Sequence, residues 1–159
     1  MEGNGEKEVG EAGRPPKEAK ETIGRLKKGK VTISQDDLIE VKQFYERILA
    51  MAAQGLFYRT GRLIGAKMWV RAKGSDMEDV FRFLKRDGWL AALRVEGDHI
   101  DVMGSVEVGE GRGPSCHILR GILTEILEQA RGSKVWCQEV ECVSTGAEHC
   151  RFTVQFGQE

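Results

Sequence analysis

The sequence predicts an α+β domain in which an antiparallel sheet packs against helices, and three observations lead to this fold class. In the first half of the chain, apolar residues recur every three or four positions, a spacing typical of helices. From Trp89 onwards, short stretches alternate with a period of two, which is typical of strands. The predicted strands and helices do not alternate strictly, so a parallel sheet built from strand–helix–strand units is not favoured.

The first 30 residues are expected to be a flexible charged tail, and residues 31–159 to form one domain. Glu, Lys and Gly dominate the tail, in which Ile23 and Leu26 are almost the sole large apolar residues. Such a segment cannot bury enough apolar surface to offset the conformational entropy that it would lose on ordering.

The first predicted helix begins at Ser34, a good N-cap that is followed by acidic residues in the first turn. Apolar residues at helical spacing then predict one buried stripe: Leu38, Val41, Tyr45, Ile48 and Ala52. We expect Gly55 to interrupt this helix.

Two further helices are expected before the strands. One covers residues 56–69, where Gly61 and Gly65 lie four residues apart and allow another element to approach the backbone closely. The other starts at the capping box Ser75–Glu78 and stops at Gly88.

The second half of the chain is expected to hold four strands and one more helix. Gly104 interrupts the alternation of the second strand and is a candidate β-bulge. The elements expected are strands over residues 89–95, 100–108, 134–143 and 150–156, and a helix that starts at Pro114–Ser115 and ends at Gly132.

The composition argues against several classes of protein. The charged residues nearly cancel, giving a net charge of −1, whereas nucleic-acid and membrane-surface binding depend on a basic excess. No apolar run approaches the roughly 20 residues that span a bilayer, and the N-terminus lacks the apolar core of a signal peptide. We therefore expect a cytoplasmic protein with no direct nucleic-acid contact and no membrane span.

The cysteines suggest a metal site near the C-terminus. Cys142 and Cys150 stand at the two ends of the predicted hairpin turn, which would bring their side chains together. Cys116 lies in the first turn of the preceding helix, where the macrodipole lowers the pKa of a thiol. Glu139 has the opposite strand parity to Cys142 and could join them only if the strand kinks or bulges. Three thiolates and a carboxylate are a reasonable tetrahedral set for zinc.

The spacing leaves other interpretations open. His149 lies beside Cys150, and Cys137 lies on the same predicted strand as Glu139, so either could serve as a ligand. Free cysteines are also common as small buried hydrophobic residues. The chain has no CxxC pair that would specify a metal site more strongly.

Several segments of the chain resemble the 4-vinyl reductase domain family, over roughly residues 34–157. The most specific similarity lies in the C-terminal part, where the spacing of cysteines and glutamate is unlikely to recur by chance. The matching segments are the helix-opening run Gly113–Leu123, the closing hairpin Val135–Cys142 with Gly146 and Cys150–Phe152, and an early helix with Gly55–Tyr58 and Gly61–Gly65.

This resemblance implies a particular ligand set. In the phenol-sensing transcription activators that contain this domain, three cysteines and a glutamate hold zinc, and their pattern matches Cys116, Glu139, Cys142 and Cys150. Four protein ligands close the coordination shell, which implies a structural zinc, because a catalytic zinc keeps one position open. Other residues that spacing allowed fall outside this set: Cys137 and His149.

The resemblance also implies a small-molecule-binding sensor or carrier domain that forms a homodimer. A hydrophobic or aromatic ligand would occupy an apolar pocket between sheet and helices, although core packing is the simpler role for each side chain taken singly. The residues with suitable parity or size to line this pocket are Trp69, Trp89, Leu93, Val95, Val135 and Cys137.

Two alternatives come from the same family. One is a reductase of tetrapyrrole vinyl groups or a protein associated with it. Against catalysis, the sequence has no dinucleotide-binding fingerprint and no catalytic constellation, and we expect no enzyme activity. The other is a dimeric assembly or docking module with a protein partner, like the distantly related vesicle-tethering TRAPP subunits.

Overall fold

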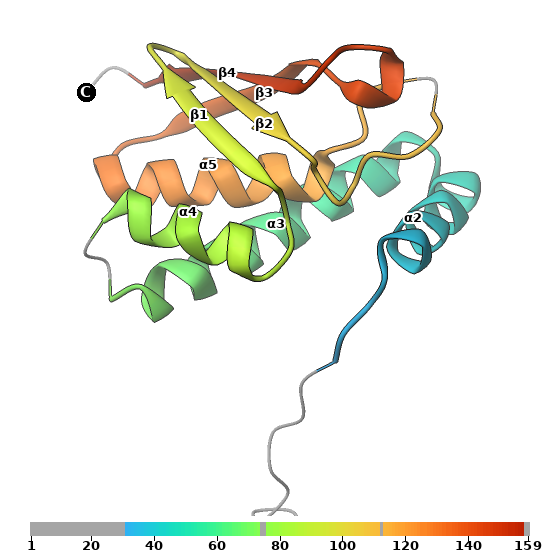
Figure 1. Cartoon of the computed structure of the whole chain (residues 1–159), viewed down its shortest axis with the longest axis horizontal. Helices are drawn as coiled ribbons and strands as arrows, with labels where there is room; N and C mark the ends of the chain where they lie inside the picture. The colour runs from blue at the N-terminus through green and yellow to red at the C-terminus, as the bar shows by residue number, and fades with distance from the viewer. Residues whose placement is uncertain (1–30, 74–75, 112, 158–159) are drawn as a thin grey trace, which may run out of the picture. The chain divides into compact units, whose positions relative to one another are not determined.

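The structure, a computed structural model, describes residues 31–73, 76–111 and 113–157. The predicted N-terminal tail and Ser75 of the predicted capping box lie outside these ranges. The unit Ile33–Glu159 holds every described helix and strand (Figure 1). In chain order these are α2 (Gln35–Leu49), α3 (Met51–Arg71), α4 (Met77–Arg86), β1 (Ala92–Glu96), β2 (His99–Met103), α5 (His117–Arg131), β3 (Val135–Glu141), the 3₁₀ helix η1 (Val143–Thr145) and β4 (Cys150–Phe156).

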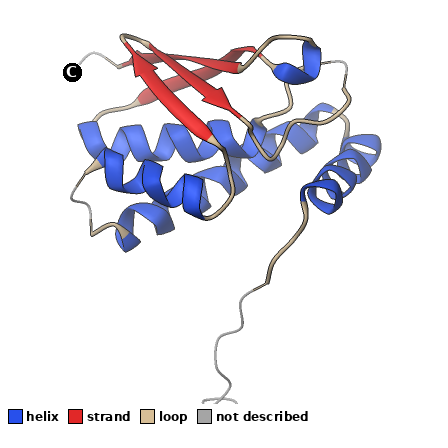
Figure 2. Ribbon diagram, viewed as in Figure 1, coloured by secondary structure: helices blue, strands red, loops and turns tan. Residues whose placement is uncertain are grey.

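The four strands form one sheet in the order β1-β2-β4-β3, and every neighbouring pair is antiparallel. Helices α3, α4 and α5 lie on the same face of this sheet (Figure 2), so the predicted α+β class is confirmed. None of the described helices combines the length and apolar character needed to cross a bilayer. The residues at the centre of the core, all almost fully buried, come from α4, α5, β2 and β4: Leu84, Leu119, Ile122, Leu123, Ile126, Ile100, Val102 and Phe152.

Helices α3 and α5 approach so closely that their backbones touch. A Cβ atom on Gly61 would lie 2.0 Å from the carbonyl oxygen of Ile118, and one on Gly121 would lie 2.1 Å from that of Tyr58. Real Cβ atoms do not come this close to a carbonyl oxygen, so both positions need glycine. The close approach predicted for Gly61 is therefore confirmed, and its partner is α5.

The predicted buried stripe on the first helix is wrong. Val41, Tyr45 and Ile48 on α2 are 45%, 45% and 62% exposed, and the side chain that α2 buries is Lys42. The helix is turned so that this lysine reaches Glu107. A buried ion pair thus decides which side of α2 faces the domain, and a count of apolar residues does not detect such a pair.

The break between the first two helices also differs from the prediction. The N-cap Ser34 is confirmed, since its side chain accepts a hydrogen bond from the backbone N–H of Asp37 at 3.1 Å. The helix ends at Ala50, which has a φ of 48°, and α3 continues through Gly55. The backbone therefore turns at an alanine in the left-handed region, where glycine would be expected.

Two strand boundaries are shorter than predicted. β1 starts at Ala92 instead of Trp89, because the backbone N–H of Trp89 donates to the carbonyl of Leu84 at the end of α4. β2 stops at Met103, because Gly104 has a φ of 63° and ends the strand instead of forming a bulge within it.

Replacing Gly121 with alanine is expected to destabilise the protein by about 1–3 kcal/mol, because the added methyl group forces α3 and α5 apart. Gly55→Ala is the matched control, since a Cβ atom there meets nothing within 4 Å. In an exposed helical position, alanine should leave the stability unchanged or raise it by about 0.5–1 kcal/mol. Urea denaturation followed by circular dichroism measures both, and equal effects of the two substitutions would contradict the backbone contact.

Candidate metal centre

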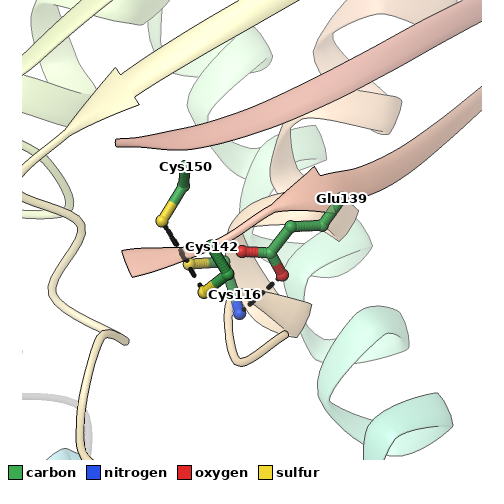
Figure 3. Close-up of side chains that lie close together, drawn as sticks. All are labelled: Cys116, Glu139, Cys142 and Cys150. Atoms are coloured by element: carbon green, nitrogen blue, oxygen red, sulfur yellow. Dashed lines mark hydrogen bonds between the residues drawn. The ribbon is translucent and has the colours of Figure 1, made fainter. Parts of the chain in front are cut away.

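Four buried side chains from separate parts of the C-terminal half converge on one point (Figure 3). Cys116 is the N-cap of α5, Glu139 lies on β3, Cys142 follows β3, and Cys150 opens β4. One potential ligand atom from each residue lies within 4.8 Å of the corresponding atom of every other. The structure thus brings together the four residues that the family resemblance implied.

Local backbone features place these side chains on the same side of the hairpin. The β3–β4 register shifts between Glu139 and Glu141, the irregularity that the strand parity of Glu139 and Cys142 required. The chain then passes through η1 to Gly146, whose φ of 98° favours glycine. This turn returns the backbone to Cys150.

The sulfur atoms lie at distances suited to a shared metal ion. The Sγ atom of Cys150 lies 3.6 Å from that of Cys116 and 3.8 Å from that of Cys142. A tetrahedral ion with metal–sulfur bonds of about 2.3 Å separates its sulfur ligands by about 3.8 Å. A disulfide would need about 2.05 Å, and all three cysteines are free.

Glu139 has one carboxylate oxygen in use and one in reserve. Its Oε2 accepts the backbone N–H of Cys116 at 3.0 Å. Its Oε1 is buried and is one of two buried side-chain polar atoms, among the described residues, that lack a hydrogen-bond partner. An unsatisfied buried acceptor is costly, and coordination of a metal ion beside the three sulfurs would satisfy it.

Within the cluster, the thiols differ in acidity. Hydrogen bonds from Cys116 and Cys150 hold the pKa of the Cys142 thiol far below its usual range. Hydrogen bonding to Cys142 and Cys150, together with burial, raises the pKa of Cys116. The lowered thiol pKa expected for Cys116 from the helix macrodipole is therefore wrong, because its neighbours outweigh the dipole. Burial also raises the pKa of Glu139 to about 8.

Serine hydroxyls surround the sulfurs, and no pattern in the sequence indicated them. Ser105 Oγ lies 3.3 Å from Cys116 Sγ, and Ser115 Oγ lies 3.6 Å from Cys142 Sγ. Ser115 also shares a hydrogen bond of 2.6 Å with Ser144. Hydroxyl groups at these distances can donate hydrogen bonds to thiolates and hold them in place.

The two other candidate ligands lie outside the cluster. The Nε2 atom of His149 lies 3.4 Å from a carboxylate oxygen of Asp101 and 3.2 Å from Arg151. Cys137 is partly buried and packs against the hydrophobic core. The geometry therefore separates these residues from the four that converge.

The six residues predicted to line a ligand pocket fall into two groups. Leu93 and Val95 on β1 line a groove of about 310 Å³ between β1 and α4. The other four pack in or against the hydrophobic core: Trp69, Trp89, Val135 and Cys137. A second hollow, of about 140 Å³, lies between α2 and the glycine-rich segment before Cys116, and no predicted pocket residue lines it.

Comparison with known proteins places the C-terminal part of the chain in a family. Residues 98–156 match the model of the 4-vinyl reductase domain, and this segment includes all four residues of the cluster. The resemblance to the 4-vinyl reductase domain family is thus confirmed for this part of the chain. No curated protein matches the sequence.

Solved structures share the fold at low sequence identity. The phenol-responsive sensory domain of the transcription activator PoxR, solved with phenol, has a TM-score of 0.64 at 19% identity, over 79% of this chain and 75% of that one. A vinyl-4-reductase family protein from Methanocaldococcus jannaschii has a TM-score of 0.56 at 19% identity, over 89% and 90%. An H-NOX protein from S. oneidensis has a TM-score of 0.55 at 14% identity, over 88% of each chain.

Proposed function

We propose that this chain is a small-molecule-binding sensor or carrier domain whose C-terminal half is held together by a structural zinc ion. Zinc would be held by Cys116, Glu139, Cys142 and Cys150. The observation that supports this most strongly is the convergence of three sulfurs, at tetrahedral spacing, on a buried carboxylate oxygen without a partner. The match to the 4-vinyl reductase domain over the same residues adds to it.

The donor set favours zinc over other ions, and a structural role over a catalytic one. Thiolates suit soft or borderline metals, whereas magnesium and calcium prefer oxygen ligands. Four protein ligands leave no position for water or substrate, so the ion would supply cross-linking and not reactivity. It would fasten the start of α5 to the β3–β4 hairpin.

Cys142→Ser is expected to remove zinc and to lower the melting temperature by roughly 10 °C, because the folded state loses an ion that the unfolded chain does not hold in place. Cys137→Ala is the matched control, since it removes a cysteine outside the cluster and should keep zinc near one ion per chain. Elemental analysis and thermal denaturation measure both quantities. A Cys142→Ser protein that keeps its zinc and its melting temperature would falsify the assignment.

The ligand is proposed to bind in the groove between α4 and β1. Its apolar lining includes Met77, Phe81, Leu93 and Val95, and its charged residues include Lys85. Such a combination suits a hydrophobic or aromatic molecule that carries a polar group. The fold shared with a phenol-responsive domain makes phenols the first compounds to test.

Thermal denaturation with a panel of phenols, fatty acids and tetrapyrroles is expected to raise the melting temperature for at least one class. Val95→Glu should abolish that shift. Val140→Glu should preserve it, because Val140 on β3 is about as exposed, at 48% against 46%, but lies outside the groove. If no compound stabilises the wild type, the ligand-binding function loses its support, and if Val95→Glu binds normally, the groove is the wrong place.

A homodimer is a second proposal, supported by an apolar stripe on α3. Leu56, Leu63 and Val70 recur at seven-residue spacing on this helix and are 52%, 68% and 75% exposed. This spacing places them on one helical face, as in paired helices. A second copy of the chain would cover the stripe.

Leu63→Glu is expected to convert a dimer to a monomer, because it places a charge in the centre of the stripe. Light scattering after size-exclusion chromatography measures the mass, and Val140→Glu should leave the dimer intact. A wild-type protein that is monomeric at high micromolar concentration would contradict the proposal and leave the stripe for another protein partner.

A further inference from the structure

Helix α2 is attached to the domain chiefly through one buried charge. Most of its large apolar side chains are exposed, including Phe44 at 50% and Ile48 at 62%. Lys42, by contrast, is 4% exposed, and it is the buried member among the lysines and arginines of the described residues. The hollow between α2 and the glycine-rich segment also shows that apolar packing does not fill this contact.

The ammonium group of Lys42 contacts the segment that leads into α5. Its Nζ atom lies 2.7 Å from Oε1 of Glu107, whose side chain is fully buried, and it also donates to the carbonyl oxygen of Ser115. Glu107 in turn accepts the backbone N–H groups of Ile118 and Leu119 at 3.0 and 2.6 Å. Lys42 thus neutralises the carboxylate that anchors the first turn of α5.

Each of these contacts lies next to a proposed metal ligand. Ser115 directly precedes Cys116, and its hydroxyl contacts Cys142. The backbone N–H of Glu107 donates to Ser105 Oγ at 3.3 Å, and the same oxygen lies 3.3 Å from Cys116 Sγ. The path from Lys42 to the nearest ligand therefore passes through one residue.

The charges favour the same connection. Three thiolates and a carboxylate carry four negative charges, of which zinc offsets two, and Glu107 adds another negative charge nearby. Charges interact strongly where water is excluded. A metal-loaded centre therefore needs a buried cation beside it more than an empty one does, and Lys42 supplies that cation.

We propose that Lys42 is a positioning residue that couples the docking of α2 to metal binding at the centre. The inference rests on the proposed zinc site. With zinc bound, Lys42 holds α2 against the domain, and with α2 docked, the centre holds zinc more tightly. Such coupling is reciprocal by thermodynamic necessity, so it can be measured from either end.

Hydrogen exchange of the full chain, with zinc and after chelation, tests the coupling in the wild type. Zinc is expected to slow amide exchange in residues 35–49 at least tenfold while leaving residues 77–86, in α4, nearly unchanged. A wild type that binds no zinc overturns the metal centre itself, and the inference with it. A wild type that binds zinc without slowing exchange in α2 overturns the coupling alone.

Variants test the coupling from the other end. Lys42→Met keeps the aliphatic stem and should weaken zinc binding, measured by competition with a chromogenic chelator, at least tenfold. Lys42→Arg should restore most of the affinity, and Arg47→Met, which removes an exposed cation of the same helix, should not change it. Unchanged affinity in Lys42→Met overturns the inference. If that variant does not fold, the exchange measurement on the wild type decides.

Discussion

Glu107 accepts the backbone N–H groups of Ile118 and Leu119, and these two hydrogen bonds fix where α5 begins. The first N–H groups of a helix have no partner within the helix, and here they are buried. Without the carboxylate, the cost of removing them from water would remain uncompensated. Because Cys116 directly precedes these residues, the same hydrogen bonds set the position of one of the four clustered ligands.

From this fixed start, α5 organises the rest of the domain. One side of the helix supplies the centre of the core beneath the sheet, and another crosses α3 at Gly61 and Gly121 with the backbones in contact. Such a crossing cannot slide without forcing atoms together, because interiors are close-packed. The start of α5 is thus held against α3 while the hairpin closes over it, and four ligand atoms can meet within a few ångströms.

The sequence predicted the sheet, α5 and the converging residues better than the N-terminal helices. Glu139 shows why the family resemblance was needed, since strand parity alone separated it from Cys142 and only a register shift brings them together. The pair between Lys42 and Glu107 had no signal, because these residues lie 65 positions apart and belong to no periodic pattern. The same pair explains why the apolar stripe of α2 misled, since burying one charge turned that helix over.

A closed metal centre and a ligand-binding groove place different demands on one small domain. The proposed zinc would use every ligand position for protein atoms, so a small molecule has to bind elsewhere. The groove is formed by α4 and β1, which contribute none of the four clustered residues. β1 is an edge strand with one hydrogen-bonded neighbour, and weakly held elements are the ones that adjust to ligands. The groove can therefore change shape while α5, β3 and β4 keep the metal ligands in place.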